Sequence, residues 1–298
     1  HRIRTHDIIC SPMATPPDAE AVVSRNTRPI IVGGCHRSGT TLIRRLLNAH
    51  SRIHCGPEIK FFRDFYGDYP DDPLWPMRFM ATARTVLPED DLLELFGRAF
   101  IAVHERAAAR EGKLRWADKT PENVLHLAEW QRLLGDRWVF LHVVRNPLDT
   151  LASIKEAKFP RTIPAELDAR IAFYHRYTKA GLEFGSAQPN RYHRIFYEQL
   201  TVSAEPTLRA LMEWLGETFE SSQLAFNDAP QQHGLEDPKV GRTSGIHTES
   251  VGRWPSVLTS EEADVVWPAT RESWARVHPD GDNAPRGLDS AGPLEPMR

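Results

Sequence analysis

Residues 29–49 limit the possible folds of this chain more than any other stretch, because a short apolar run passes there through glycines into a helical pattern. Residues 29–34 are rich in β-branched side chains and end in two glycines, which predicts a buried strand that enters a turn. In residues 40–49 leucine and isoleucine recur at helical spacing, which predicts an amphipathic helix. A strand, a glycine-containing loop and a helix in direct succession are typical of α/β proteins.

The remainder of the chain continues this alternation. Residues 138–144 form the clearest buried strand, which ends before Asn146, a residue able to cap a helix, and Pro147, which suits a first helical position. Further strands are predicted at residues 52–55, 115–118 and 192–196, and helices at residues 88–110, 123–134, 147–157, 165–184 and 204–215. Strands that alternate with helices predict an α/β fold with a central parallel sheet and helices on both faces.

Composition favours one globular unit. Of the 298 residues, 41% are hydrophobic and 26% are charged, which is ordinary for a globular protein and sufficient for one large core. We therefore expect a single domain over residues 28–278. The flanking segments, residues 1–27 and 279–298, are rich in proline, glycine and polar residues, so we expect them to be poorly ordered tails.

Charge and cysteine content exclude several classes of protein. A net charge of −3 gives no general attraction to nucleic acid or to anionic membranes, and no run of about 18 apolar residues is present to span a membrane. Three scattered cysteines, Cys10, Cys35 and Cys55, fit neither a disulfide framework nor a zinc site. The first 27 residues lack the apolar core of a signal peptide, so a cytoplasmic location is predicted.

The loop at residues 34–41, Gly-Cys-His-Arg-Ser-Gly-Thr-Thr, has the glycine spacing of a P-loop. Such a loop points backbone N–H groups at an anion beside a helix N-terminus, although a tight turn without a ligand is the alternative. Nucleoside-triphosphate loops carry Lys-Ser/Thr after the last glycine, whereas Thr40 and Thr41 stand here and the cation is Arg37. The strongest strand is followed by Arg145 rather than by an acidic residue. The loop therefore favours an anionic donor that is bound without metal.

Residues 37–42, Arg-Ser-Gly-Thr-Thr-Leu, resemble the 5′-phosphosulfate loop of sulfotransferases that use 3′-phosphoadenosine 5′-phosphosulfate (PAPS). Residues 33–58, which close with Cys-Gly-Pro-Glu, resemble the tyrosylprotein sulfotransferases and their bacterial relatives, and the likeness extends over residues 29–258. It implies metal-independent transfer of a sulfuryl group from PAPS to an acceptor hydroxyl, with 3′-phosphoadenosine 5′-phosphate (PAP) as the product. The residues implied at the 5′-phosphate are Arg37, Ser38, Gly39, Thr40 and Thr41.

The resemblance also implies a site for the 3′-phosphate of PAPS. Arg145 ends a strand and Ser153 lies on the helix that follows, so both can reach the crevice at the carboxyl ends of the strands. The alternative is that Arg145 pairs with Asp149 and that Ser153 is solvated. Tyr197 matches a position near the nucleotide, but it could equally be a half-buried tyrosine at a strand end.

Two late segments, residues 239–243 and 251–254, resemble a stretch that folds over the nucleotide. They carry Arg242 and Arg253. A basic, glycine-containing loop is suited to ordering around an anion, so both arginines are candidate donor contacts. They could also be surface charges, and the sequence leaves the two alternatives open.

Sulfuryl transfer requires a base for the acceptor hydroxyl and cations for the leaving group. Glu58 matches the catalytic glutamate of the family, although Lys60 stands where the tyrosylprotein pattern has arginine, and an exposed carboxylate paired with Lys60 is the alternative. Lys119 matches a lysine that touches the leaving phosphosulfate, and its alternative is a solvated loop lysine. Together with Arg37, Lys119 would offset the charge that Mg²⁺ offsets in kinases. Asp118 is expected to orient the loop.

Two rival functions and the acceptor remain open. A P-loop kinase or nucleotide hydrolase is disfavoured by the missing lysine, and a non-catalytic PAPS- or nucleotide-binding protein is disfavoured by Glu58 and Lys119. A small molecule, a glycan or a peptide could be the acceptor, and a homodimer is compatible with the sequence. Residues 61–111 and 156–165 are expected to shape the acceptor pocket, with core packing as the alternative for their aromatic residues, Phe61, Phe62, Phe65, Tyr66, Tyr69, Trp75 and Phe79.

Overall fold

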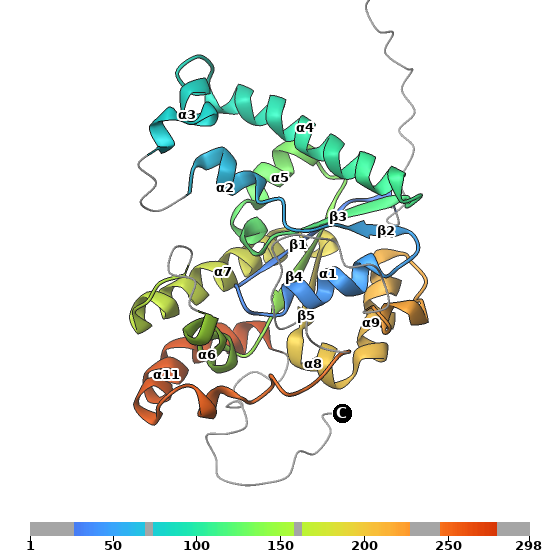
Figure 1. Ribbon diagram of the computed structural model, residues 1–298. Helices are drawn as coiled ribbons and strands as arrows, with labels where there is room; N and C mark the ends of the chain where they lie inside the picture. The colour runs from blue at the N-terminus through green and yellow to red at the C-terminus, as the bar shows by residue number, and fades with distance from the viewer. Residues whose placement is uncertain (1–26, 69–73, 158–162, 227–244, 279–298) are drawn as a thin grey trace, which may run out of the picture.

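The computed structural model describes residues 27–68, 74–157, 163–226 and 245–278 (Figure 1). Its centre is a five-stranded sheet in the order β2-β3-β1-β4-β5. All neighbouring strands are parallel. The strands are β1 (Ile30–Gly34), β2 (Ile53–Cys55), β3 (Arg115–Lys119), β4 (Val139–Val144) and β5 (Tyr192–Phe196). The predicted parallel sheet of a single α/β domain is therefore confirmed, whereas most of the two predicted tails lies outside the described residues.

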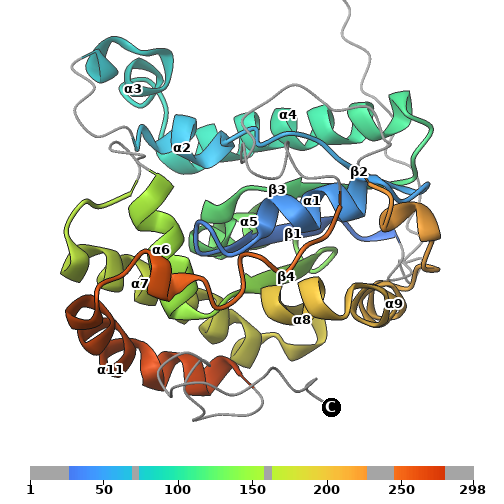
Figure 2. The same ribbon diagram turned by 60° about the horizontal axis from the view of Figure 1, so that its bottom comes forward.

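Helices cover both faces of the sheet, as predicted (Figures 1 and 2). One face packs against α1 (Thr40–Asn48), α8 (Tyr197–Val202) and α9 (Ala204–Leu215). The other face packs against α4 (Glu89–Arg110), α5 (Leu127–Leu134), α6 (Pro147–Ala157) and α7 (Leu167–Ala187). Outside this second layer lies α11 (Ser260–Val277), and α2 (Phe61–Tyr66) and α3 (Phe79–Ala83) lie beside α4.

The two faces explain why the central strands are apolar without interruption. In β1, Ile31 enters the core beneath α4 to α7, while Ile30 and Val32 enter the core beneath α1, α8 and α9. In β4, Phe140 joins the first core and Leu141 the second. Every residue of both strands is buried, so the polar alternation of a half-exposed strand is absent.

Several helices were predicted with different bounds or not at all. The predicted helix at residues 123–134 is divided into a 3₁₀ turn, Pro121–Leu125, and α5. The sequence analysis missed α2, α3, α8 and α11. One signal for α11 was present, because Thr259 and Glu262 form a reciprocal capping box, with Glu262 N–H donating to Thr259 Oγ1 (3.2 Å) and Thr259 N–H to Glu262 Oε2 (2.9 Å).

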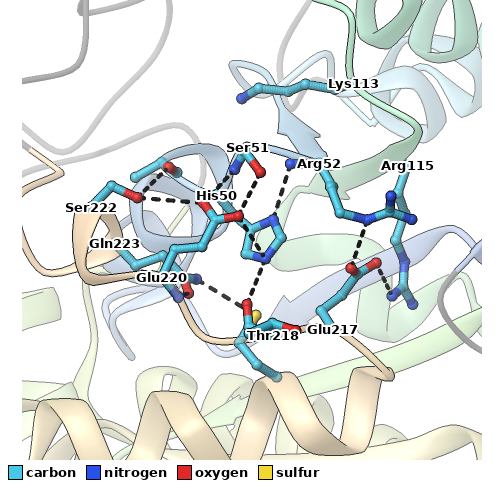
Figure 3. A network of polar contacts seen from close by, with 12 residues as sticks. His50, Ser51, Arg52, Lys113, Arg115, Glu217, Thr218, Glu220, Ser222 and Gln223 are labelled. Carbon is cyan, nitrogen blue, oxygen red and sulfur yellow. Dashed lines mark hydrogen bonds and ion pairs between the residues drawn. The ribbon is translucent and has the colours of Figure 1, made fainter.

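A polar network fastens the amino-terminal edge of the sheet (Figure 3). Glu217, in the segment after α9, accepts from Arg52 Nε (3.0 Å) and from an Arg115 Nη1 that lies 3.4 Å away. His50 Nδ1 accepts the Arg52 N–H (3.0 Å), so its Nε2 carries the proton and donates to the Thr218 carbonyl (2.9 Å). These contacts bind the turn before β2 to the chain after α9.

Candidate functional site

The loop predicted to bind an anion lies at the opposite, carboxyl-terminal edge of the sheet. Ser38 closes it, because its N–H donates to the Cys35 carbonyl (3.2 Å) and its hydroxyl lies 2.6 Å from that oxygen and 3.2 Å from the Val143 carbonyl. Gly39 has φ of 97°, and a Cβ atom there would lie 2.3 Å from a Tyr197 ring carbon. Glycine is therefore required where the loop meets α1.

The start of α1 has the properties of an anion site. The first helical hydrogen bond that reaches back to Gly39 comes from Ile43 N–H (3.3 Å), so the N–H groups of Thr40, Thr41 and Leu42 have no acceptor within the helix. No side chain among the described residues caps this end. These N–H groups and the helix dipole together favour negative charge beside the loop.

The other predicted donor residues meet at this loop. Arg37, in left-handed backbone with φ of 68°, donates from Nε to Ser153 Oγ (3.1 Å). Arg145 donates from Nη1 to the Arg37 carbonyl (2.9 Å) and from Nη2 to the Ser250 carbonyl, and its guanidinium carbon lies 4.6 Å from the centre of the Tyr197 ring. The Arg145 Nε is buried and has no hydrogen-bond partner among the residues that the structure describes. A buried guanidinium with an unused donor is suited to an anion.

The alternatives for Arg145 and Ser153 do not hold among the described residues. Asp149 accepts the backbone N–H groups of Gly252 (2.7 Å) and Trp254 (3.0 Å) with its two carboxylate oxygens. Ser153 is buried rather than solvated. Tyr197 is buried, follows the last residue of β5 directly and begins α8.

Glu58 and Lys119 lie in direct contact. Lys119 is the last residue of β3, its side chain is fully buried, and its Nζ donates to Glu58 Oε1 and to Thr41 Oγ1 (3.4 Å). Lys60 Nζ lies 3.8 Å from Glu58 Oε2. Glu58 is therefore neither free nor paired with Lys60 alone, since two ammonium groups face its carboxylate beside the start of α1.

The end of β3 is fixed by side chains that the sequence analysis did not identify. Asn123 donates to Asp118 Oδ1 (2.6 Å) and to the Val32 carbonyl (3.0 Å), which joins β3 to β1. His104 Nε2 lies 3.2 Å from Asp118 Oδ2. Lys119 follows Asp118 directly, so these contacts set the place from which it reaches Glu58.

The two histidines nearest in sequence to the site are both held by other carboxylates. His36 Nε2 lies 3.1 Å from Glu122 Oε1, and His54 Nδ1 lies 3.0 Å from Glu111 Oε2 at the end of α4. Burial tends to raise the pKa of Glu122, but His36, the backbone and Lys60 together lower it to about 2. Glu122 is thus ionised at neutral pH and available to His36.

Glu198 is another buried carboxyl group, and it lies beside Arg145. Glu198 Oε1 accepts the Asn146 N–H (2.9 Å), and in the described ranges its Oε2 has no hydrogen-bond partner. Burial raises the pKa of Glu198 to about 7, although the Asn146 N–H and the charge of Arg145 oppose this shift. Asn146 also caps α6, as predicted, because its Oδ1 accepts the Leu148 N–H (2.9 Å).

Several residues that the sequence suggested for the donor or acceptor site are not part of the contacts around Arg145 and Glu58. Arg253 pairs with Glu156 on α6, and its side chain is 35% exposed. Arg242 and residues 239–243 lie outside the described residues, as do Tyr69 and the side chain of Trp75. In the aromatic stretch, Phe62 and Phe65 belong to the core, so packing accounts for two of the side chains expected at the acceptor pocket.

The described residues contain neither a candidate metal cluster nor a helix suited to a bilayer. In the described ranges, no three histidine, cysteine, aspartate or glutamate side chains gather as metal ligands would. None of the helices within those ranges combines the length and the apolarity that crossing a bilayer requires.

The parallel sheet, the loop at its carboxyl edge and the helix that follows it define an α/β protein of the P-loop type. The sequence model of the sulfotransferase family matches residues 29–221, and the chain belongs to that family.

Individual relatives agree with this assignment. A Caenorhabditis briggsae protein whose name places it among the protein-tyrosine sulfotransferases is 26% identical over 235 residues, which cover 76% of this chain and 80% of that protein. The Drosophila melanogaster protein-tyrosine sulfotransferase is 24% identical over 83% of this chain, which spans about half (52%) of its length. The sulfotransferase domain from the curacin biosynthetic pathway has the same fold, with a TM-score of 0.57, 18% identity and coverage of 81% of this chain and 96% of that domain.

Proposed function

We propose that this protein transfers a sulfuryl group from PAPS to an acceptor hydroxyl. The observation that carries the proposal is the contact of Lys119 with both Glu58 and Thr41. It sets a carboxylate and a buried ammonium group beside the uncapped start of α1. A base, a cation and an anion site are the three elements that sulfuryl transfer requires.

The donor would lie along the carboxyl edge of the sheet. Arg37 and the N–H groups of Gly39, Thr40 and Thr41 would hold the 5′-phosphate end, and Ser38 keeps this loop closed. Arg145 and Ser153 would hold the 3′-phosphate, and the buried Arg145 Nε, which has no partner within the described part of the chain, fits that role. Tyr197, beneath the Arg145 guanidinium, would support the nucleotide side.

When bound, PAPS supplies a sulfuryl group attached through a bridging oxygen to its 5′-phosphate. Glu58 Oε2, which is farther from a lysine than Oε1, would accept the proton of the acceptor hydroxyl. The acceptor oxygen forms a bond to sulfur while the bond from sulfur to the bridging oxygen breaks. Lys119 and Arg37 would offset the charge that develops on departing PAP, and the proton remains on Glu58.

The acceptor is proposed by class. A small-molecule, glycan or peptide alcohol would meet the requirement for a hydroxyl, and the names of two relatives make a tyrosine-containing peptide the first to test. Pro57, Ile59 and Lys60 depart from the tyrosylprotein pattern around Glu58 and argue for a wider panel. A homodimer and a cytoplasmic location stay predictions.

Membership of the sulfotransferase family removes the kinase alternative and leaves a non-catalytic PAPS-binding protein to be tested. The experiment is calorimetry with PAP and with 5′-AMP in EDTA, followed by transfer of labelled sulfate from PAPS to phenols, glycans and tyrosine peptides. We expect PAP to bind more tightly than 5′-AMP without metal, and at least one acceptor to be labelled. Equal affinities for the two nucleotides would refute the donor assignment, and PAP binding without transfer to any acceptor would favour the non-catalytic alternative.

A further inference from the structure

Residues 248–258, called here the strap, run along the start of α6. In Figure 2 the strap is the orange-red segment that passes from the side of α8 toward α6 and α11. Trp254, within the strap, is buried in the main core beside Leu148 of α6. The strap therefore belongs to the packed structure at the carboxyl edge of the sheet.

Asp149 attaches the first half of the strap to α6 through polar contacts. This residue, in the first turn of α6, is only 2% exposed. Its Oδ2 accepts the Gly252 N–H (2.7 Å) and its Oδ1 the Trp254 N–H (3.0 Å). Gly252 has φ of 69°, in the left-handed region that favours glycine, so the backbone turns there to present both N–H groups to one carboxylate.

The strap in turn holds Arg145. The Ser250 carbonyl accepts from Arg145 Nη2, while the Arg37 carbonyl accepts from Nη1. The guanidinium is thus fixed on one side by the phosphate loop and on the other by the strap. Since Asp149 sets the strap on α6, the position of the Ser250 carbonyl depends on Asp149.

A buried carboxylate this near the proposed 3′-phosphate is unfavourable for binding an anion unless its charge is compensated. The two N–H groups of the strap provide that compensation. Arg145, which could have paired with Asp149, is left with an Nε that has no hydrogen-bond partner among the described residues. The arrangement keeps a buried arginine and a buried aspartate four positions apart without an ion pair between them.

We propose that Asp149 is a positioning residue that acts through the strap to aim the Arg145 guanidinium at the 3′-phosphate of the donor. This inference rests on the proposed function, because it requires that Arg145 bind that phosphate. Asp149 itself does not touch the donor. Substitution of Asp149 should therefore lower the affinity only for ligands that carry a 3′-phosphate.

The first test is Asp149→Asn, which keeps the shape and removes one of the two acceptors. We expect calorimetry to show PAP affinity reduced about tenfold, the scale of one weakened charge-assisted contact, and 5′-AMP affinity changed less than about twofold. The matched control is Lys155→Met. Lys155, also on α6, donates to the Val257 carbonyl (3.1 Å) farther along the strap and to Glu262 (2.6 Å), so this variant should lower the melting temperature without a selective loss of PAP affinity.

A second pair of variants serves if Asp149→Asn does not fold. The space around a Cβ atom at Gly252 is open, so Gly252→Val strains only the backbone, whereas Gly252→Asn is compatible with left-handed φ. We expect the valine variant to lose PAP affinity selectively and the asparagine variant to retain it.

The outcomes separate the inference from the proposed function. A wild-type protein that binds PAP and 5′-AMP equally would overturn the proposed function. A wild-type preference for PAP, with equal losses for both nucleotides in Asp149→Asn or Gly252→Val, would overturn the positioning role. In an Arg145→Ala background, Asp149→Asn should cause less than about a twofold further loss of PAP affinity, and an undiminished loss would contradict a path through Arg145.

Discussion

Strand β3 carries a buried cation at each end, and each cation faces a glutamate. At the amino edge Arg115 pairs with Glu217, and at the carboxyl edge Lys119 pairs with Glu58. The Arg115 guanidinium also donates to the carbonyl of Arg28 (2.5 Å) and to that of Leu215 (2.9 Å). Within the part of the chain that the structure describes, the Lys119 ammonium group has one further contact, the Thr41 hydroxyl (3.4 Å).

The difference fits a structural role for the Arg115–Glu217 pair and the proposed chemical role for the Lys119–Glu58 pair. A guanidinium is a planar fork, and backbone carbonyls on two sides fix its direction, whereas an ammonium group can redirect its three donors. Burial lowers the pKa of Arg115 to about 10 despite Glu217, so it stays charged at neutral pH. The Glu217 side chain is 2% exposed and that of Glu58 is 12% exposed, which leaves only Glu58 accessible to an acceptor.

The largest expected effect comes from Glu58→Gln, which keeps the shape and removes the basic oxygen. Turnover should fall by about 10²- to 10⁴-fold, as is typical when an acid–base group is lost, while PAP affinity changes little. The loss should shrink for nitrophenols, because their hydroxyl groups ionise without help. Steady-state rates over a series of phenols of different pKa measure this dependence.

The control for Glu58 is the rival base. If Glu58→Gln retains nearly full activity on an acceptor of high pKa, Glu58 is as structural as Glu217 and the comparison fails. His36→Gln would then be measured next, since His36 lies in the loop itself.

The next effect is on stability and concerns the amino edge. Glu217→Gln leaves Arg115 buried with a weaker partner, and the free energy of unfolding should fall by about 3 kcal/mol, at the low end for breaking a buried ion pair. Urea unfolding measures this loss. PAP affinity and turnover per folded molecule should remain within about twofold of wild type. A selective loss of turnover in the folded variant would show that the two edges are coupled.

The strands could be predicted from the sequence, whereas the contacts between their ends could not be predicted from local pattern. All five strands were predictable because the central strands are buried on both faces and the flanking glycine, asparagine and proline residues mark their ends. The contact of Glu58 with Lys119 could be anticipated only from the family likeness, because the two residues are far apart in the chain and meet through the parallel pairing of β2 with β3.

The hydrogen-bond partners of Asp149 and Asn123 could not be predicted from the sequence. Asp149 offered an apparent partner in Arg145 four positions earlier, but it binds backbone N–H groups that follow it by about a hundred residues, and a backbone donor leaves no mark on the sequence. Asn123 was assigned to a helix, whereas it joins β3 to β1 from a 3₁₀ turn. The local sequence pattern therefore predicted helices, strands and charged residues, but the partner of each polar side chain depends on tertiary contacts.

A smaller effect is expected at the end of β4. Arg145→Ala should weaken PAP roughly 10- to 100-fold, the loss of one charge-assisted contact of about 1.5–3 kcal/mol, while affinity for 5′-AMP barely changes. Calorimetry with both nucleotides measures the difference. If Arg145 were a structural arginine like Arg115, both affinities would fall together as the folded fraction decreased, and the 3′-phosphate assignment would be lost.

The smallest expected effect concerns pH and lies between the two edges, at His142 in the middle of β4. Burial lowers its pKa from 6.5 to about 3, with a further contribution from the charge of Arg194, and its Nδ1 lies 2.8 Å from the Tyr192 hydroxyl. Between those two pKa values the unfolded chain binds a proton that the folded chain does not, so this contribution to stability is complete above pH 6.5 and is lost progressively as the pH falls toward 3.

Lowering the pH from 7.5 to 5.5 should therefore reduce the free energy of unfolding by about 1 kcal/mol through His142. Burial also lowers the pKa of His193 to about 4 and raises that of Glu198 to about 7, so both groups contribute to the pH response in this range. The contribution of His142 is therefore the difference in pH response between wild type and His142→Asn, measured by urea unfolding at both pH values. PAP affinity of the folded protein should not change with the protonation of His142, since His142 contacts neither the loop nor Arg145. A change in PAP affinity over the same pH range, abolished in His142→Asn, would mean that protonation of His142 is coupled to the site at the carboxyl edge.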